Sequence, residues 1–229
     1  MRVTAVIAAL DFEMHPEARW SSPFAGKTVL EQVAANVLAC PVIMDACIAS
    51  DDPELLECGA YGGLPVRAMP APMRRYLFNP LSLTLNHLSM ERNLHQAVGM
   101  AGDIVAHIPW SMPLLDASCL ERLYHVLLED PLPARITPIT PEDPALFTRF
   151  PGQKGFFPVW HAPAMDRQRV PQLYRSVPVS LNHMHRMRVG IPFVKGLPLD
   201  PSKLVRIKGP EDLDLARYLF ERPTAGPEA

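Results

Sequence analysis

Short apolar runs alternate with amphipathic segments along most of the chain. Residues 3–9 (VTAVIAA) form a continuous run rich in β-branched residues, which is typical of a strand covered on both faces. Between residues 28 and 38, apolar residues recur at helical spacing. The same reasoning predicts strands at residues 42–50, 64–68, 103–108, 135–139 and 203–207, and helices at residues 53–61, 89–100, 116–128 and 210–220.

This alternation of strands and helices predicts an α/β fold. Such βαβ units build a mostly parallel central sheet, so we expect a three-layer, Rossmann-like architecture in one domain over residues 1–222. Residues 223–229 are expected to form a flexible tail. Ligands of such sheets bind where the strands end, so Leu10, Asp51 and Pro109 should gather at one edge.

Composition and charge narrow the class of protein. The chain has 229 residues and 26 prolines, and the prolines concentrate at residues 65–80 and 131–171 among apolar residues, which favours ordered loops. Lys plus Arg is 22 against 24 for Asp plus Glu, which argues against binding to nucleic acid or anionic membranes. With no apolar run of about 18 residues, no leader and four cysteines without C-x-x-C spacing, we expect a cytoplasmic protein.

The beginning of the chain combines a strand, a loop and the start of a helix at Gly26 and Lys27. That order can hold a nucleotide phosphate on backbone N–H groups. The loop between them is not glycine-rich, however, and it carries Asp11, Glu13 and Glu17, whose charges repel a phosphate.

Short segments spread over nearly the whole chain match the motifs of a known family in order. They are residues 9–19 (ALDFEMHPEAR), 26–31 (GKTVLE), 49–52 (ASDD), 63–66 (GLPV), 103–116 (DIVAHIPWSMPLLD), 167–174 (RQRVPQLY) and 207–216 (IKGPEDLDLA). With them the chain resembles the cytidylyltransferase-like sugar nucleotidyltransferases, the group of the CMP-sialic acid and CMP-Kdo synthetases and of spore-coat polysaccharide protein F.

The resemblance implies an activity and a set of partners. The family transfers a nucleotidyl group from a nucleoside triphosphate, here CTP, to a sugar in surface polysaccharide or glycoconjugate synthesis, with Mg²⁺ neutralising the phosphates. It also implies a homodimer, and a lid or dimerisation arm in the proline-rich residues 140–185. By resemblance, Arg19 and Lys27 are charge-stabilising catalytic residues, and we add Arg206, which stands where the family has a carboxylate. The nucleotide-binding residues implied are Ala8, Ala9, Leu10, His15, Arg19, Asp51, Trp110 and Ser111, and the sugar-binding residues are Arg167, Gln168 and Tyr174.

The sequence departs from the family pattern where the metal should bind. Ser111 replaces the aspartate of the family's G-D-x-P motif, Trp110 replaces its glycine, and residues 206–208 (RIK) replace a second acidic pair. Because Mg²⁺ prefers carboxylate and water oxygens, the case for this ion is weak, and we expect no metal ligands. Arg206 and Lys208 could supply positive charge in its place. The alternative is a catalytically inactive relative that binds a nucleotide, a sugar or a partner.

Several of these residues also fit ordinary structural roles. Asp51 and Asp52 precede Pro53 and would suit the start of a helix, and loop carboxylates could neutralise Arg19. The indole of Trp110 could stack on a base or fill the crevice. Residues 180–188 alternate like a strand, which would put His183 and His185 on one side without a third metal ligand.

Overall fold

The computed structural model describes residues 1–10, 14–69, 98–142, 147–148, 157–158, 173–188 and 194–222. Its central strand is β1 (Val3–Ala9), in which every residue is buried. β1 pairs in parallel with β4 (Ile43–Ser50) on one side and with β7 (Ile104–Pro109) on the other. The bounds predicted for β1 are confirmed, and those of its two neighbours differ by one residue at their ends.

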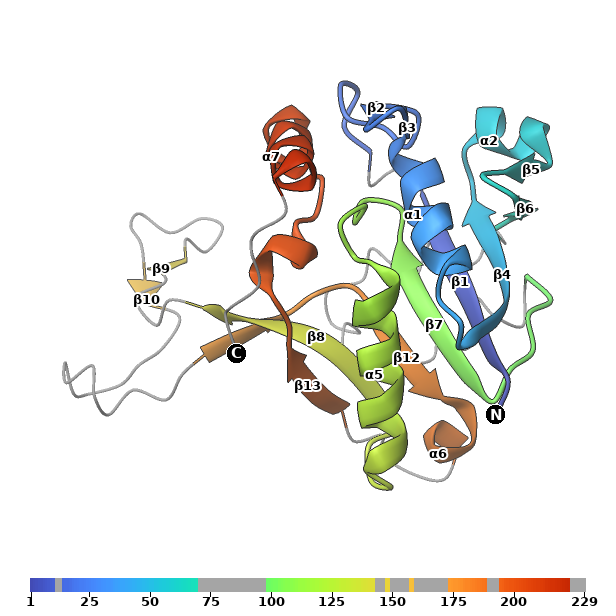
Figure 1. Cartoon of the computed structure of the whole chain (residues 1–229), viewed down its shortest axis with the longest axis vertical. Coiled ribbons are helices and arrows are strands. Elements are labelled where there is room, and N and C mark those ends of the chain that lie inside the picture. Colours follow the sequence, from blue (N-terminus) through green and yellow to red (C-terminus); the bar gives the residue numbers. More distant parts are fainter. Residues whose placement is uncertain are drawn as a thin grey trace.

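The described strands form a nine-stranded sheet in the order β11-β8-β12-β7-β1-β4-β6-β5, with β13 paired to β8 (Figure 1). β12 is antiparallel to both β7 and β8, so β8 runs in the same direction as β1. The predicted α/β class with a mostly parallel sheet is therefore confirmed. The remaining strands are β5 (Ala60–Tyr61), β6 (Leu64–Ala68), β8 (Arg135–Glu142), β11 (Leu173–Ser176), β12 (Ser180–His183) and β13 (Val194–Pro198).

Polar side chains cap the starts of three of the α-helices. Thr28 and Glu31 form a capping box at the start of α1 (Val29–Leu38), and Asp116 caps α5 (Ala117–Glu129). Asp52 caps α2 (Pro53–Cys58), and α7 (Pro210–Glu221) begins with a proline. α1 and α5 lie on the same face of the sheet (Figure 1).

Alternate residues of β1 enter two separate cores. Ala5 and Ile7 belong to the larger cluster, which includes the buried residues of α1 and α5, whereas Val6 and Leu10 belong to a smaller cluster on the other face. This alternation follows from the period of two along a strand and explains why all of β1 is apolar except Thr4. Burial on both faces fixes the strand and the position of its carboxyl end.

Three sequence predictions about local structure are wrong. The helix expected at 53–61 ends at Cys58, because Gly59 turns the chain with a positive φ of 65° into β5. The strand expected at 203–207 is replaced by a short 3-10 helix, η3 (Pro201–Leu204). Residues 180–188 divide into β12 and α6 (Met184–Arg188), so His183 and His185 do not share one strand.

The proline-rich region between residues 140 and 185 contributes to the main sheet at both ends. β8 runs into it, and β11 and β12 return from it antiparallel to β8. Between them lies a separate pair, β9 (Phe147–Thr148) with β10 (Phe157–Pro158). The helix expected at 89–100 lies outside the described residues up to position 97, and residues 98–100 are not helical. Within the described parts of the chain, no helix is long and apolar enough to span a bilayer.

Candidate functional site

The carboxyl ends of β1, β4 and β7 meet at one edge of the sheet, as the sequence predicted for Leu10, Asp51 and Pro109. Ala8 of β1 is in register with Pro109, and Ala9 with Ser50. The Ser50 hydroxyl donates to the Ala9 carbonyl oxygen at 2.7 Å and accepts the Asp52 amide at 3.0 Å. On the other side of β1, the Trp110 amide donates to the Ala8 carbonyl oxygen at 2.9 Å.

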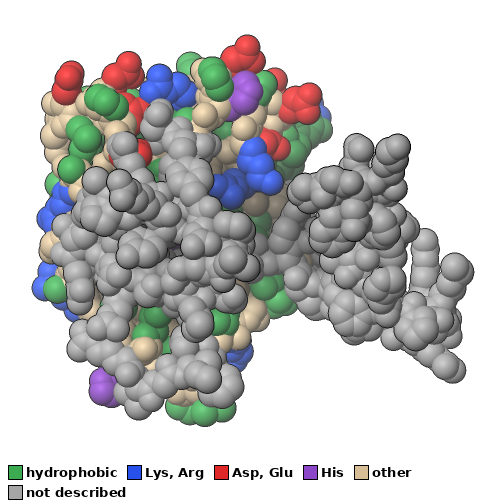
Figure 2. Space-filling model, turned by 180° about the vertical axis from the view of Figure 1, so that it is seen from behind, with side chains coloured by type: hydrophobic (Ala, Val, Ile, Leu, Met, Phe, Trp, Pro, Cys, Tyr) green, Lys and Arg blue, Asp and Glu red, His purple; other side chains and the backbone are tan. Residues whose placement is uncertain are grey.

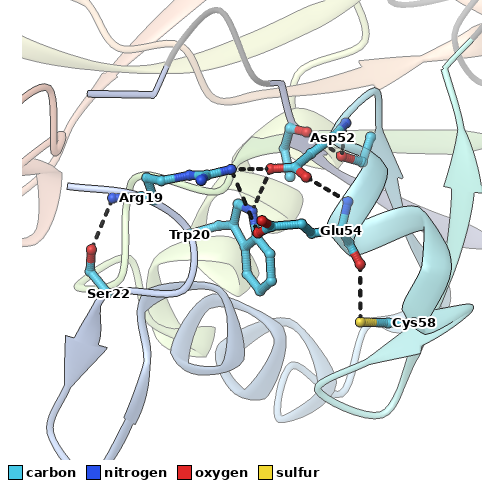
Figure 3. Close-up of polar contacts among 8 residues, drawn as sticks. Arg19, Trp20, Ser22, Asp52, Glu54 and Cys58 are labelled. Atoms are coloured by element: carbon cyan, nitrogen blue, oxygen red, sulfur yellow. Dashed lines mark hydrogen bonds and ion pairs between the residues drawn. The ribbon is translucent and has the colours of Figure 1, made fainter. Parts of the chain in front are cut away.

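Arg19 lies at this edge in an ion pair with Asp52 (Figure 3). Its Nη2 is 2.7 Å from Oδ2 of Asp52 and 3.9 Å from Oε2 of Glu54. The Asp52 side chain is 1% exposed, whereas the Arg19 side chain is 34% exposed. The sequence suggested that carboxylates of its own loop would neutralise Arg19, but the partner comes from the end of β4.

The Asp52 carboxylate also accepts hydrogen bonds from other groups. Nε1 of Trp20 donates to Oδ2 at 2.8 Å, and the Glu54 amide at the start of α2 donates to Oδ1 at 2.9 Å. Burial alone raises the pKa of Asp52, but the hydrogen bonds from Trp20, Arg19 and the α2 amides outweigh it and hold the pKa below its ordinary value. Asp52 is therefore a buried carboxylate anion that joins the loop before α1 to the start of α2.

The start of α1 does not offer its first amides to an anion. The amides of Val29 and Leu30 donate to the carbonyl oxygens of Ser22 and Trp20, at 3.0 and 3.1 Å. The Glu31 amide donates to the Thr28 hydroxyl at 3.2 Å. These are the N–H groups that the strand–loop–helix pattern suggested for a phosphate, and each already has an acceptor within the chain.

Gly26 and Lys27 have a local role in a small hairpin. The turn between β2 (Pro23–Phe24) and β3 (Lys27–Thr28) requires positive φ at Ala25 (48°) and at Gly26 (79°). Lys27 is exposed on this hairpin, beside the capping residue of α1. It forms no ion pair with any carboxylate of the described residues.

The end of β7 is buried. Trp110 is 0% exposed and belongs to the larger core, and Ser111 is 1% exposed. The Ile207 amide donates to the Ser111 carbonyl oxygen at 2.8 Å, so half-buried Arg206 lies in the chain beside Ser111. The two sequence segments that depart most from the family's metal motif are thus neighbours in space.

Two polar atoms at this end of β7 lack partners. The indole Nε1 of Trp110 and the hydroxyl of Ser111 are buried, and neither has a hydrogen-bond partner within the part of the chain that the structure describes. Leaving such groups unpaired costs about 1–3 kcal/mol each. In this conformation the Trp110 ring fills the core and turns no face toward the surface.

The described side chains at this edge do not suit Mg²⁺. The resemblance puts its carboxylates at positions that hold Ser111 and residues 206–208. The nearby Asp52 carboxylate already accepts from an arginine and an indole. Among the described residues, no group of three or more His, Cys, Asp or Glu side chains is arranged to hold a metal ion.

Charges of both signs occur along the upper edge of the molecule, where the strands end (Figure 2). Glu17 and Glu54 are exposed there, and so is Lys27. The described part of this edge therefore has no uniformly positive surface of the kind that would attract a polyanion by itself.

The other residues assigned by resemblance are dispersed. Ala8, Ala9 and Leu10 are buried at the end of β1, and Asp51 is half-buried. His15 is exposed, and its Nδ1 accepts the Glu17 amide at 3.2 Å. Arg167 and Gln168 lie outside the described residues, and Tyr174 lies on β11, where only the backbone is described.

The sequence reasoning missed Trp20 and Ser50 as parts of this edge. Trp20 follows Arg19 in a polar loop, and an indole in such a place usually has a hydrogen-bond partner for its N–H. Its ring packs edge-on against Tyr61 at a centroid distance of 5.0 Å. Ser50 looked like the last residue of a strand. Its hydrogen bond to the Ala9 carbonyl oxygen depends on the register of β1 and β4, and its bond from the Asp52 amide is local.

Neither a family model nor a curated protein sequence matches this chain. Solved structures do. A CMP:2-keto-3-deoxy-manno-octonic acid synthetase complexed with CTP is 11% identical, covers 96% of this chain and 99% of its own, and has a TM-score of 0.63. A 4-diphosphocytidyl-2C-methyl-D-erythritol synthase from Anaerococcus prevotii is 12% identical, with coverages of 96% and 99% and a TM-score of 0.60.

A further 4-diphosphocytidyl-2C-methyl-D-erythritol synthase is 15% identical, covers 96% of this chain and 98% of its own, and has a TM-score of 0.63. Identities this low establish the fold and not the chemistry. This shared fold agrees with the resemblance seen in the sequence. The chain thus has the Rossmann-like fold of the cytidylyltransferases.

Proposed function

We propose that this chain binds a cytidine nucleotide and a sugar at the carboxyl edge of its sheet, as a divergent relative of the sugar nucleotidyltransferases. The observation that supports the proposal most directly is the hydrogen bond from the Ile207 amide to the Ser111 carbonyl oxygen. It brings the chain at Arg206 beside the strand end where the resemblance puts a metal. A guanidinium can neutralise phosphate oxygens without an ion.

Arg19 and Lys27 are the other cations that we assign to the nucleotide phosphates. Lys27 is exposed and meets no carboxylate within the described parts of the chain, so its ammonium is accessible to an anion. Arg19 is a third exposed but shares its charge with Asp52. We expect Lys27 to contribute more to binding than Arg19 does in the conformation described.

Binding without metal-dependent turnover is the function that this geometry supports best. Ser111 is a poor ligand for Mg²⁺, and Asp52, fully engaged with its donors, is a poor substitute. This is the alternative of a catalytically inactive relative that binds a nucleotide, a sugar or a partner subunit. A homodimer and a sugar contact through Arg167, Gln168 and Tyr174 remain part of the proposal on the resemblance alone.

Nucleotidyl transfer to a sugar is the second candidate, favoured by the position of Arg206 beside Ser111. In that reaction a sugar hydroxyl oxygen forms a bond to the α-phosphorus of CTP and releases its proton to solvent. The bond from the α-phosphorus to the bridging oxygen breaks, and pyrophosphate leaves with the electron pair. Arg206, Lys27 and Arg19 would stabilise the charge that develops on the phosphates.

Thermal melting with CTP, with and without Mg²⁺, tests the binding proposal. We expect CTP to raise the melting temperature equally in both conditions, because the bound state is stabilised without a metal. Arg206→Gln should abolish the increase, whereas Arg122→Gln, at an exposed arginine on α5, should leave it intact. If no nucleotide shifts the melting temperature, both nucleotide functions are wrong.

Pyrophosphate release separates the two candidates. The full chain is incubated with CTP and a panel of 2-keto and hexose sugars, with and without Mg²⁺. Release that requires a sugar and disappears in Arg206→Gln would establish transfer. Binding of CTP without release in any combination would establish the inactive relative. An increase in melting temperature that appears only with Mg²⁺ would contradict our assignment of a metal-free site.

A further inference from the structure

Asp52 has more hydrogen-bond partners than Arg19 and is more deeply buried. Asp52 accepts from Trp20 and from the α2 amides as well as from Arg19, and its side chain is almost completely buried. Within the described residues, the Arg19 guanidinium has Asp52 and Glu54 as its only carboxylate partners, and Glu54 is 71% exposed and 3.9 Å away. The pair can therefore separate in one direction only, by movement of Arg19.

Loss of the guanidinium would leave Asp52 with good partners. The indole N–H of Trp20 at 2.8 Å and the Glu54 amide at 2.9 Å both remain, so the carboxylate is not left unpaired in the core. The Arg19 side chain, by contrast, reaches solvent and has a long flexible stem. Its backbone amide stays anchored on the Ser22 hydroxyl at 2.9 Å, so the side chain can move without the loop.

From this asymmetry we infer that Asp52 is an internal competitor for Arg19, and that the pair sets the affinity of the edge for phosphate groups. The inference rests on the proposed function, in which those groups are the phosphate chain of a nucleotide. An anion binds Arg19 fully only when it draws the guanidinium away from Asp52. Weakly charged anions then compete poorly, while a diphosphate or triphosphate competes well.

Asp52→Asn is the variant that isolates this effect. Asparagine has the same shape and carries no charge, but it has one acceptor oxygen where aspartate has two. It can therefore cap α2 or accept the Trp20 indole N–H, and its NH2 group cannot hold the Arg19 guanidinium. We expect it to bind inorganic pyrophosphate about five-fold more tightly than the unmodified chain, the factor that corresponds to a part-exposed ion pair. Glu54→Gln, at the distant partner, should change the affinity less.

The measurement is calorimetric titration of the full chain with inorganic pyrophosphate at low ionic strength, where charge effects are least screened. Arg19→Gln should bind more weakly, and Asp52→Asn should give no gain when Arg19→Gln is also present. That loss of the gain is the signature of competition for one guanidinium. An affinity that is unchanged or lower in Asp52→Asn overturns the inference, as does a gain that persists without Arg19.

The indole N–H signal of Trp20 in nuclear magnetic resonance keeps the inference testable if Asp52→Asn does not fold. Trp20 shares Oδ2 of Asp52 with Arg19, so departure of the guanidinium must change the environment of that N–H. We expect its signal to shift when pyrophosphate is added to the unmodified chain. Assignment comes from its loss in Trp20→Phe, and an unmoved signal at saturation would overturn the inference.

The titrations also keep this inference apart from the proposed function. In one outcome, CTP raises the melting temperature, but Asp52→Asn and the unmodified chain bind pyrophosphate equally well. That outcome contradicts the competition between Asp52 and phosphate and leaves the proposed nucleotide site standing. A five-fold gain for pyrophosphate without any CTP effect supports the competition and removes the nucleotide proposal.

Discussion

The two halves of the carboxyl edge differ in how their buried polar groups are paired. At the end of β4, Ser50 makes two hydrogen bonds and Asp52 accepts from Arg19, Trp20 and Glu54. At the end of β7, Nε1 of Trp110 and the Ser111 hydroxyl are as deeply buried and have no partner among the described residues. Both strands are neighbours of β1, so the difference lies in the residues and not in the frame.

This contrast indicates that the two halves of the edge have different roles. A fully paired polar network stiffens the region around it, and the one at β4 ties the loop before α1 to α2. Unpaired buried groups carry an energetic cost that nothing in the described structure offsets, and such groups concentrate at functional positions. The β7 half is therefore where we look for the reacting groups of the ligand, and the β4 half holds the edge in shape and supplies Arg19 to the phosphates.

The largest expected effect is the loss of Trp110. Trp110→Ala removes a fully buried indole from the main core and should lower the free energy of unfolding by about 3–5 kcal/mol. Urea denaturation measures the loss. The control is Leu132→Ala, at a side chain that is 72% exposed, and its free energy of unfolding should stay within about 0.5 kcal/mol of the unmodified chain. A loss below about 1 kcal/mol would mean that the ring is not part of the core.

Trp110→Phe tests the unpaired N–H separately. It removes the indole N–H together with part of the ring volume. The cavity lowers the stability, whereas the loss of a buried donor without a partner raises it, so the two effects oppose each other. The same change at Trp20 also breaks a hydrogen bond to Asp52. We expect Trp20→Phe to lower the stability more than Trp110→Phe does, although Trp110 is the more deeply buried; the reverse order would contradict the contrast between the halves.

Removal of Asp52 is expected to rank next. Asp52→Ala leaves the indole N–H of Trp20 and the Glu54 amide without an acceptor and removes the cap of α2. One unpaired buried donor and one lost cap together suggest a loss of about 2–4 kcal/mol in urea denaturation. Asp52→Asn, which keeps one of the two acceptor oxygens, should lose less. Equal losses in the two variants would mean that the charge, and not the hydrogen bonds, holds the network.

The sequence predicted the strands that form this edge better than the side-chain contacts between them. Residues 3–9 lie in a strand buried on both faces, and such a strand reads as an unbroken apolar run whatever its neighbours are. The partner of Arg19 could not be found in this way, because Asp52 is 33 positions away and only the pairing of β1 with β4 brings the two together. The burial of Trp110 likewise depends on how several elements pack.

Local patterns failed where a short element ends. The helix expected to reach residue 61 ends before Gly59, whose positive φ turns the chain. Residues 203–207 have strand-like composition, but Asp200 and Pro201 start a 3-10 turn before them. Propensity summed over five residues is too weak to override such a start signal.

The two serines of the edge provide a smaller and closely matched test. Ser50 is 0% exposed with two hydrogen bonds, and Ser111 is 1% exposed with none from its hydroxyl to any described residue. Ser50→Ala should cost about 1–2 kcal/mol, while Ser111→Ala should be near neutral or stabilising, because it removes an unpaired hydroxyl. Thermal and urea unfolding of both variants checks this. A clear loss in Ser111→Ala would mean that its hydroxyl already has a partner.

The smallest expected effect is a pH dependence at Asp116, which caps α5 a short distance along the chain from Ser111. Burial raises the pKa of this carboxyl, but Lys203 at 2.8 Å, the Ser118 hydroxyl and the Cys119 amide lower it from 3.8 to about 2. Since the folded pKa is the lower one, the stabilisation is complete above pH 3.8 and is lost as the pH falls toward 2.

Both side chains of this pair are more than a third exposed, so solvent screening limits the contribution to less than about 1 kcal/mol. Asp116→Asn keeps a capping side chain without the charge, so its stability should lie slightly below that of the unmodified chain above pH 3.8 and converge with it toward pH 2. Urea unfolding across that range measures the difference. A gap that stays constant with pH would mean that Asp116 acts only as a cap, and that its pairing with Lys203 does not help to hold the β7 half in place.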